Sequence, residues 1–283
     1  MRCNEEFSKS DKHTIPLSSH LALRIYSETK PHNWQIADLQ KGLILVYKGV
    51  EMVGEGTGFG VPVLICSDET YFSGSAQVYM SRQDDSKIIR KMFFMDTVQR
   101  KKIGRVNLEN QKVCAISRYQ AGLYQKHRHL RLLMPLIMES LSARIGVRNS
   151  FVKTASAGSI IVTYDTSQSG IRVKTDFSLM KRKKLQKILM LNEQGARYFR
   201  RYSDSNGTKL VDRQIGAWKK IEAEWASITD LQGRLGFRLH EAKNSVLCRG
   251  REFLRGCLDW IGLDYEIDPR TASFEYEIEI LGS

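Results

Sequence analysis

Alternation of apolar and polar side chains is the dominant pattern in this chain. The clearest case is a pair of segments, 159–165 and 171–178, separated by a short polar loop that contains Gly170. The second segment alternates along its length, which gives a strand one buried and one exposed face. The pattern therefore predicts a β-hairpin. Residues 273–281 alternate strictly, with glutamates on one face, and predict a half-buried strand near the C-terminus.

Shorter apolar segments rich in β-branched and aromatic residues indicate further strands. We expect these strands at 41–48, 61–66, 70–80, 91–98, 183–191, 196–202, 216–227 and 234–239. No regular alternation of strands with helices is visible, so the sheets are expected to be antiparallel. The pattern as a whole predicts a mainly β fold, a large antiparallel β-sandwich.

One segment has the periodicity of a helix. Apolar residues recur at three- and four-residue steps from Leu123 to Ile145, and they predict one substantial helix near 119–145. Pro135 is expected to bend or divide this helix, because proline lacks the amide donor and clashes with the preceding turn. Gly146 is a suitable end for it.

The chain is expected to consist of an arm and one domain. The first thirty residues are polar and are followed by Pro31, which predicts an N-terminal arm over 1–30. A length of 283 residues suits either one large all-β domain or two smaller ones. Since no boundary is visible after the arm, we expect a single β-sandwich domain over 31–283.

Several classes of protein are excluded by simple features of the sequence. No run of eighteen apolar residues occurs, so no membrane span is expected. The first residues lack the apolar core of a secretory signal, which favours a cytoplasmic location. The five cysteines are widely spaced and form no C-x-x-C pair, so we expect free thiols, no metal site and no cofactor.

Charge is distributed unevenly along the chain. The net charge is +13, and region 87–148 holds 14 Lys and Arg against three acidic residues, whereas region 259–283 holds seven acidic residues against one arginine. A positive surface of this kind attracts an anionic partner, such as nucleic acid, a sugar phosphate or an acidic sugar. The alternative is a solvated basic face without a partner.

A glycine-rich stretch, 54–60, contains the first candidate catalytic residue, Glu55. Phe59 stands where the third glycine of a dinucleotide-binding loop would be, and a strand follows in place of a helix, so a nucleotide loop is not expected. A bent or bulged strand accounts for the glycines. Glu55 is a candidate acid or base if it faces a cleft, and otherwise a glutamate at a turn.

Further candidates lie in the expected helix. His127 is a possible general base and Tyr119 a possible acid–base partner, and Arg118 and Arg131 are possible anion contacts. His129 lies about 200° from His127 around a helix, so the two histidines are not expected to share a metal ion. The alternative for each histidine is a surface position.

Two more sets of residues suit a sugar. Glu193 and Arg197 lie in a polar segment between apolar segments and offer hydrogen bonds to hydroxyl or acidic groups, although an ordinary hairpin loop has the same composition. Trp218 is the tryptophan that we select as a platform for a sugar ring. Core packing is the alternative interpretation for each tryptophan.

The series of antiparallel strands, with 54–62 and the hairpin 160–178, resembles the galactose-mutarotase-type supersandwich domains over about residues 34–239. Such domains occur in sugar epimerases and in polysaccharide lyases and hydrolases. No catalytic His–Glu pair of those families is matched here, so no residue role is taken from them. The resemblance implies a carbohydrate-active protein, an epimerase or lyase acting on an anionic sugar or sugar phosphate by acid–base chemistry. The alternative is a non-catalytic nucleic-acid-binding protein that uses the basic region 87–148.

Overall fold

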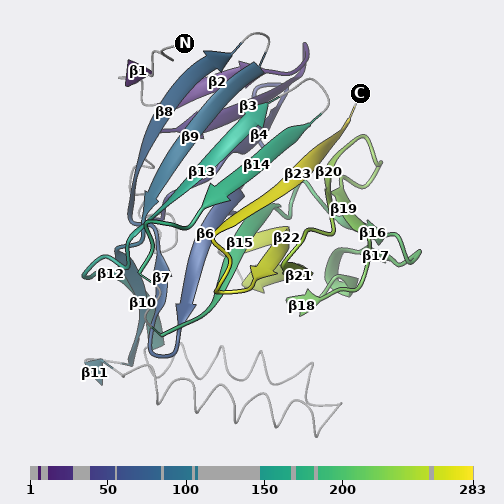
Figure 1. The fold of residues 1–283 in the computed structure, drawn as a ribbon. Helices are drawn as coiled ribbons and strands as arrows, with labels where there is room; N and C mark the ends of the chain where they lie inside the picture. The colour runs from purple at the N-terminus through teal and green to yellow at the C-terminus, as the bar shows by residue number, and fades with distance from the viewer. Residues whose placement is uncertain are drawn as a thin grey trace, which may run out of the picture.

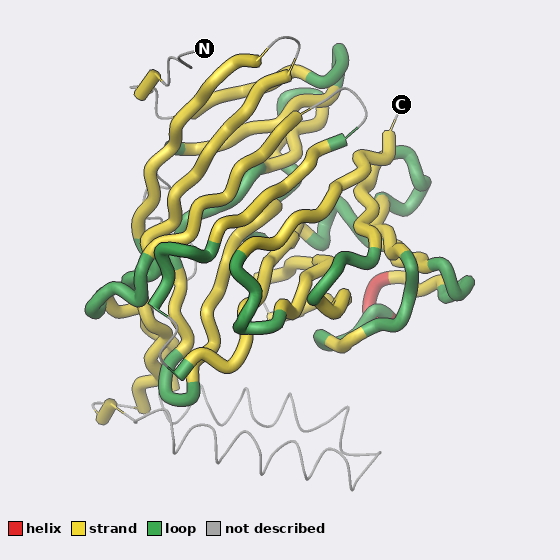
Figure 2. The backbone as a smooth tube through the Cα atoms, viewed as in Figure 1, coloured by secondary structure: helices red, strands yellow, loops and turns green. Residues whose placement is uncertain are grey.

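The computed structural model describes residues 6–7, 12–27, 39–54, 56–83, 86–103, 106–107, 147–166, 170–181, 184–254 and 258–282. Antiparallel strands make up most of this backbone (Figure 2). Within these ranges the one labelled helix is the 3-10 turn η1 (Asp212–Gln214), and no helix is long and apolar enough to cross a membrane. No substantial helix is found within the described residues, and the segment 119–145, where one was expected, lies wholly outside them.

One layer of the molecule is a ten-stranded antiparallel sheet (Figure 1). Its strands, in spatial order, are β1 (Glu6–Phe7), β8 (Ser75–Gln83), β9 (Ser86–Phe94), β13 (Ser159–Thr166), β14 (Ile171–Asp176), β23 (Ser273–Gly282), β20 (Leu235–His240), β19 (Trp225–Thr229), β16 (Arg201–Asp204) and β17 (Lys209–Val211). The predicted hairpin is confirmed as β13 and β14, and the predicted C-terminal strand as β23. Buried and exposed positions alternate along β14, as the sequence pattern requires.

A second layer is a nine-stranded antiparallel sheet. Its strands, in spatial order, are β11 (Val106–Asn107), β10 (Thr97–Ile103), β7 (Thr70–Phe72), β6 (Gly58–Cys66), β15 (Leu185–Gly195), β22 (Leu258–Ile267), β21 (Ser245–Leu254) and β18 (Lys219–Lys220), with β12 (Val147–Lys153) paired to β10. The mainly β, sandwich-like architecture is therefore confirmed.

A four-stranded sheet begins in the segment that was expected to be an arm. It consists of β2 (Lys12–Pro16), β3 (Leu21–Tyr26), β4 (Ile44–Tyr47) and β5 (Val50–Glu51). Residues 12–26 form a hairpin whose Ile15, Leu23 and Ile25 belong to the core. Because most residues of the segment are polar, the sequence did not predict this hairpin. Three apolar residues are nevertheless enough to bury one face of a short hairpin.

Four other expected strands are wrong in part. Segment 70–80 is divided between β7 and β8, and segment 91–98 between β9 and β10, and in each case the two strands belong to different sheets. Residues 196–198 form a turn, and β16 begins only at Arg201. The turn is closed by the amide of Tyr198, which donates to the carbonyl of Gly195 over 3.0 Å. Ala196 and Phe199 lie in and directly after this turn, and both are fully buried. Their apolar side chains therefore indicate burial and not a strand. Segment 216–227 is likewise divided between β18 and β19.

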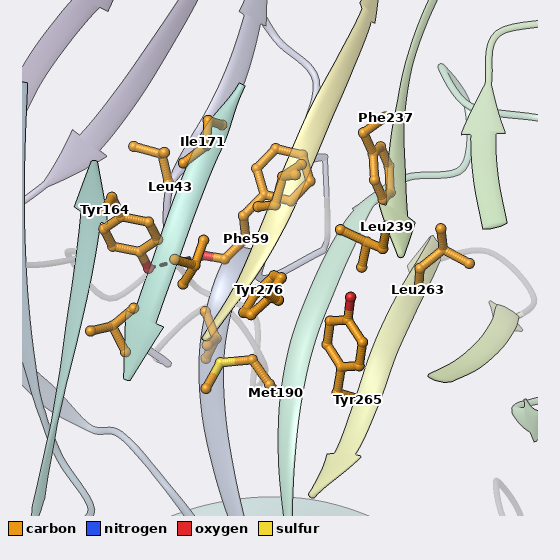
Figure 3. Packing of buried hydrophobic residues seen from close by; sticks show 14 of the residues in the cluster. Leu43, Phe59, Tyr164, Ile171, Met190, Phe237, Leu239, Leu263, Tyr265 and Tyr276 are labelled. Carbon is orange, nitrogen blue, oxygen red and sulfur yellow. Dashed lines mark hydrogen bonds between the residues drawn. The ribbon is translucent and has the colours of Figure 1, made fainter. Parts of the chain in front are cut away.

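The layers enclose one hydrophobic core, seen from close by in Figure 3. Phe59 of β6 and Phe237 of β20 meet edge to face, with ring centroids 5.0 Å apart. The hydroxyl of Tyr164 crosses between the sheets and donates to the carbonyl of Phe59 over 2.9 Å. Its ring lies against Gly60, where a Cβ atom would be 2.9 Å from the tyrosine oxygen, so this glycine is required by close packing.

Candidate acid–base groove

The outer face of the nine-stranded sheet carries the candidate site. Residues in register on adjacent strands present their side chains to the same face. Glu193 of β15 pairs with Gly262 of β22, which pairs with Gly250 of β21. Ile261 and Leu263 point into the core, so Gly262 faces away from it. One row across three strands therefore holds a carboxyl group and then two positions without side chains.

The indole of Trp218 lies over these two glycines. A Cβ atom at Gly250 would lie 2.4 Å from Cδ2 of Trp218, and one at Gly262 would lie 2.9 Å from its Cη2. Any side chain at Gly250 would displace the ring, so the pair of glycines makes the seat of the indole. Trp218 precedes β18 in the chain and reaches over the sheet from a loop.

Glu193 lies next to this indole. A Cβ atom at Gly262 would lie 3.1 Å from Cγ of Glu193 and 2.9 Å from Cη2 of Trp218, so the two side chains flank the same glycine. Burial, with 7% of the residue exposed, raises the pKa of Glu193 to about 7. The negative charge of Glu252 adds to this shift, and the positive charge of Lys41 opposes it.

Two more carboxyl groups complete an acidic cluster. Burial, together with the charges of Glu193 and Glu252, raises the pKa of Asp264 well above its ordinary value. Asp264 accepts a hydrogen bond of 2.8 Å from the amide of Asn192. Burial also raises the pKa of Glu252, although a hydrogen bond from Trp218 lowers it. Because the charges of Glu193 and Glu252 disfavour ionisation of Asp264, and that of Glu252 disfavours ionisation of Glu193, the cluster holds protons near neutral pH and can both donate and accept them.

A buried asparagine fixes the position of this cluster from the core side. Oδ1 of Asn192 accepts hydrogen bonds from the hydroxyl of Tyr276 over 2.7 Å and from the amide of Gly60 over 3.1 Å. Its own amide holds Asp264, as described above, and its neighbour in β15 is Glu193. Asn192 therefore links the ten-stranded sheet to the backbone beneath the acidic cluster.

The cluster opens into a groove with a volume of about 510 Å³, which is within the usual range for small-molecule sites. Its lining also includes apolar side chains, namely Val63, Ile65, Phe72, Leu189 and Leu191. At one end Lys187 and Lys220 both pair with Glu266, at 3.0 and 2.8 Å. Two ammonium groups thus share one carboxylate, which leaves a surplus positive charge beside the protonated cluster.

The structure brings together two of the residues predicted from sequence, Glu193 and Trp218. Arg197 lies elsewhere: its guanidinium stacks 4.6 Å from the ring centroid of Tyr198, in a separate hollow of about 300 Å³. The other candidates, Glu55, Tyr119, His127, Arg118 and Arg131, lie outside the described residues.

Sequence reasoning missed Asp264, Glu252 and Lys220. The available signal was weak, because each acidic residue sits singly at an outward position of a strand, where a charged side chain is ordinarily solvated. The glycine pair that seats Trp218 was also missed, since the register between β21 and β22 is not visible in the sequence.

The glycine-rich stretch has a structural explanation. Gly54, Gly58 and Gly60 adopt positive φ angles, and the register between β6 and β15 shifts near Leu191. The expected bent and bulged strand is therefore confirmed. A Cβ atom at Gly56 would lie 2.7 Å from the carbonyl oxygen of Glu193, so this glycine lets the bent chain approach the acidic cluster.

No protein-family model matches the chain, and a search of curated proteins finds no significant relative. Within the described ranges, no three His, Cys, Asp or Glu side chains are arranged to hold a metal ion.

Proposed function

We propose that the groove binds an anionic sugar, and that Glu193 transfers a proton to or from it. The observation that carries this proposal is a buried, proton-holding carboxyl group and an indole that flank the same glycine and line one open groove. A carboxyl group with a pKa near neutrality is suited to general acid–base catalysis. The indole offers an apolar face of the kind that a sugar ring can cover.

The charges of the groove suit an acidic sugar. Lys187 and Lys220 have a surplus positive charge over Glu266, and we assign to them the carboxylate or phosphate of the ligand. Protonation of Glu193 and Asp264 reduces the negative charge that an anion would otherwise meet. Hydroxyl groups of the ring would then hydrogen-bond with Glu252 and Asp264.

A uronic acid allows a balanced reaction in this setting. Glu193 removes the proton from the carbon next to the sugar carboxylate, and the electron pair of the broken C–H bond moves into that carboxylate, which the lysines stabilise. Return of a proton to the opposite face gives the epimer. Alternatively, the neighbouring ring carbon loses its oxygen substituent. Its C–O bond breaks, a C=C bond forms between the two carbons, and Glu252 or Asp264 protonates the departing oxygen. Both outcomes share the first step, so the residues support an epimerase or a lyase.

Binding is tested by titrating the protein with uronic acids and sugar phosphates and following the ligand signals by NMR. We expect Trp218→Ala to weaken binding at least about tenfold, which corresponds to about 1.4 kcal/mol. Glu277→Gln is the matched control, because Glu277 is exposed on β23 of the other sheet. Wild-type protein that binds no acidic sugar, or W218A protein that binds as well as wild type, would contradict the proposal.

Nucleic-acid binding through region 87–148 stays as the alternative proposal. Most of this region lies outside the described residues, and Lys91 within it is fully buried, with its ammonium donating to the carbonyls of Tyr26 and Lys41 over 2.9 and 2.8 Å. Lys91 therefore does not contact phosphates. Affinity for nucleic acid that falls steeply with salt, in a protein that binds no uronate, would favour this alternative.

A further inference from the structure

A second, larger hollow adjoins the groove. Its volume is about 850 Å³, and it shares Lys219 and Lys220 of β18 with the groove as lining residues. β18 thus forms the boundary between the two. Lys220 is in register with Cys248, which lines the groove, whereas Lys219 is in register with Arg249, which lines the hollow. Both lysines line both sites, so β18 connects the groove to the hollow.

Arg249 is the distinctive residue of the hollow. Only 5% of it is exposed, and its guanidinium stacks 4.7 Å from the ring centroid of Tyr202 and donates to the carbonyl of Ile215. Among the described residues no carboxylate lies within ion-pair distance of it. A buried guanidinium that is oriented by an aromatic ring and a carbonyl, and that lines an open hollow, is suited to receive an acidic group.

The acidic residue of the hollow that acts on Arg249 is Asp204, whose charge opposes the effect of burial on the pKa of Arg249 without forming an ion pair with it. Asp204 is itself engaged, because it accepts hydrogen bonds from the hydroxyl of Tyr202 over 2.7 Å and from two backbone amides, those of Asn206 and Thr208, over 3.1 and 3.0 Å. The other acids are exposed residues of the lining, namely Glu222, Glu224 and Glu241. They would repel a densely charged polyanion, so the hollow suits a ligand with one acidic group per sugar unit.

We propose that the hollow binds a second acidic unit of an oligouronate whose first unit occupies the groove, with Arg249 and Lys219 contacting its carboxylate. This inference rests on the proposed function of the groove. It specifies the substrate class as a chain of uronic acids that crosses β18, in place of a single sugar.

The test compares binding of a uronic acid monomer with its dimer, trimer and tetramer, by calorimetry. For wild-type protein we expect affinity to rise about tenfold or more once the sugar oligomer is long enough to reach the hollow, because it then gains a charge-assisted contact. Lys219→Met and Arg249→Met should each remove this rise, and Arg249→Met should leave affinity for the monomer unchanged, because Arg249 lines the hollow and not the groove. Lys174→Met, at an exposed position of β14, is the charge-matched control and should keep the rise.

The outcomes separate the two proposals. Monomer binding without a gain from chain length, or a gain that persists in both K219M and R249M, would overturn the second site and leave the groove intact. Binding of no uronate at all would overturn the proposed function, and the second site with it. If R249M protein fails to fold, the exposed Lys219 still decides the question.

Discussion

At the scale of single residues, the environment of Glu193 has a consequence for folding. A carboxyl group in the unfolded chain titrates near pH 4.5, whereas burial holds the pKa of Glu193 in the folded protein at about 7. Between these two values the folded state binds more protons than the unfolded state. The free energy of unfolding therefore decreases as pH rises through this window, and the contribution of Glu193 is constant above it.

Replacement of Glu193 by Gln should remove this dependence. Relative to wild type, E193Q protein should gain stability on the order of 3 kcal/mol as pH rises from 4.5 to 7, from the size of the pKa shift. Urea unfolding at a series of pH values measures the difference. E277Q, at an exposed position, should follow the wild-type curve. Identical pH profiles for E193Q and wild type would show that Glu193 is not buried with a raised pKa.

Residue types alone were a partial guide to the site. Glu193 and Trp218 could be selected because a carboxylate and an indole are the groups that a sugar site needs. Asp264 could not, because its importance comes from burial and from the charge of a residue far away in the sequence. Arg197 has the same chemistry as an anion ligand, but its stacking on Tyr198 directs it to another hollow.

At the scale of elements, the site depends on the register of β21 against β22. The pairing of Gly250 with Gly262 creates the flat seat for Trp218, and a shift of one residue would put Arg249 or Arg251 there. Strands with clear alternation, such as β14 and β23, were predictable for the same physical reason. The register between distant strands was not, since it is fixed only by tertiary packing.

The seat of the indole can be tested by substitution. Gly250→Ala should displace Trp218, because the new Cβ atom would lie 2.4 Å from the ring, and uronate affinity should fall about tenfold. In the W218A background the same substitution should have no further effect on affinity. Calorimetric titration of wild type, G250A, W218A and the double variant measures both effects. If the losses of uronate affinity from the two substitutions add up in the double variant, Gly250 does not act by seating Trp218.

At the scale of the whole molecule, the two large sheets are joined by a polar link within an apolar core. Asn192 accepts from Tyr276 of the ten-stranded sheet while its backbone holds Asp264 on the outer face of the other sheet. Packing of the layers and placement of the acidic cluster are therefore coupled. The sandwich architecture was predictable from strand patterns, whereas this link required the contact between β15 and β23.

Asn192→Ala should destabilise the fold by about 2–3 kcal/mol, because it leaves the buried hydroxyl of Tyr276 and the amide of Gly60 without their acceptor. Gln186→Ala, at an exposed position of the same strand, should change stability by no more than about 0.5 kcal/mol. Urea denaturation at one pH compares the two variants. Equal stabilities would mean that the link does not hold the sheets together.

The central claim is that Glu193 transfers a proton at an acidic sugar in the groove. Its most direct test is exchange of the hydrogen next to the uronate carboxylate in heavy water, followed by NMR. We predict that wild type and E277Q catalyse this exchange with a bound uronate, and that E193Q binds the same ligand without exchanging it. No exchange by the wild-type protein with a uronate that it binds, or undiminished exchange by E193Q, would contradict the account.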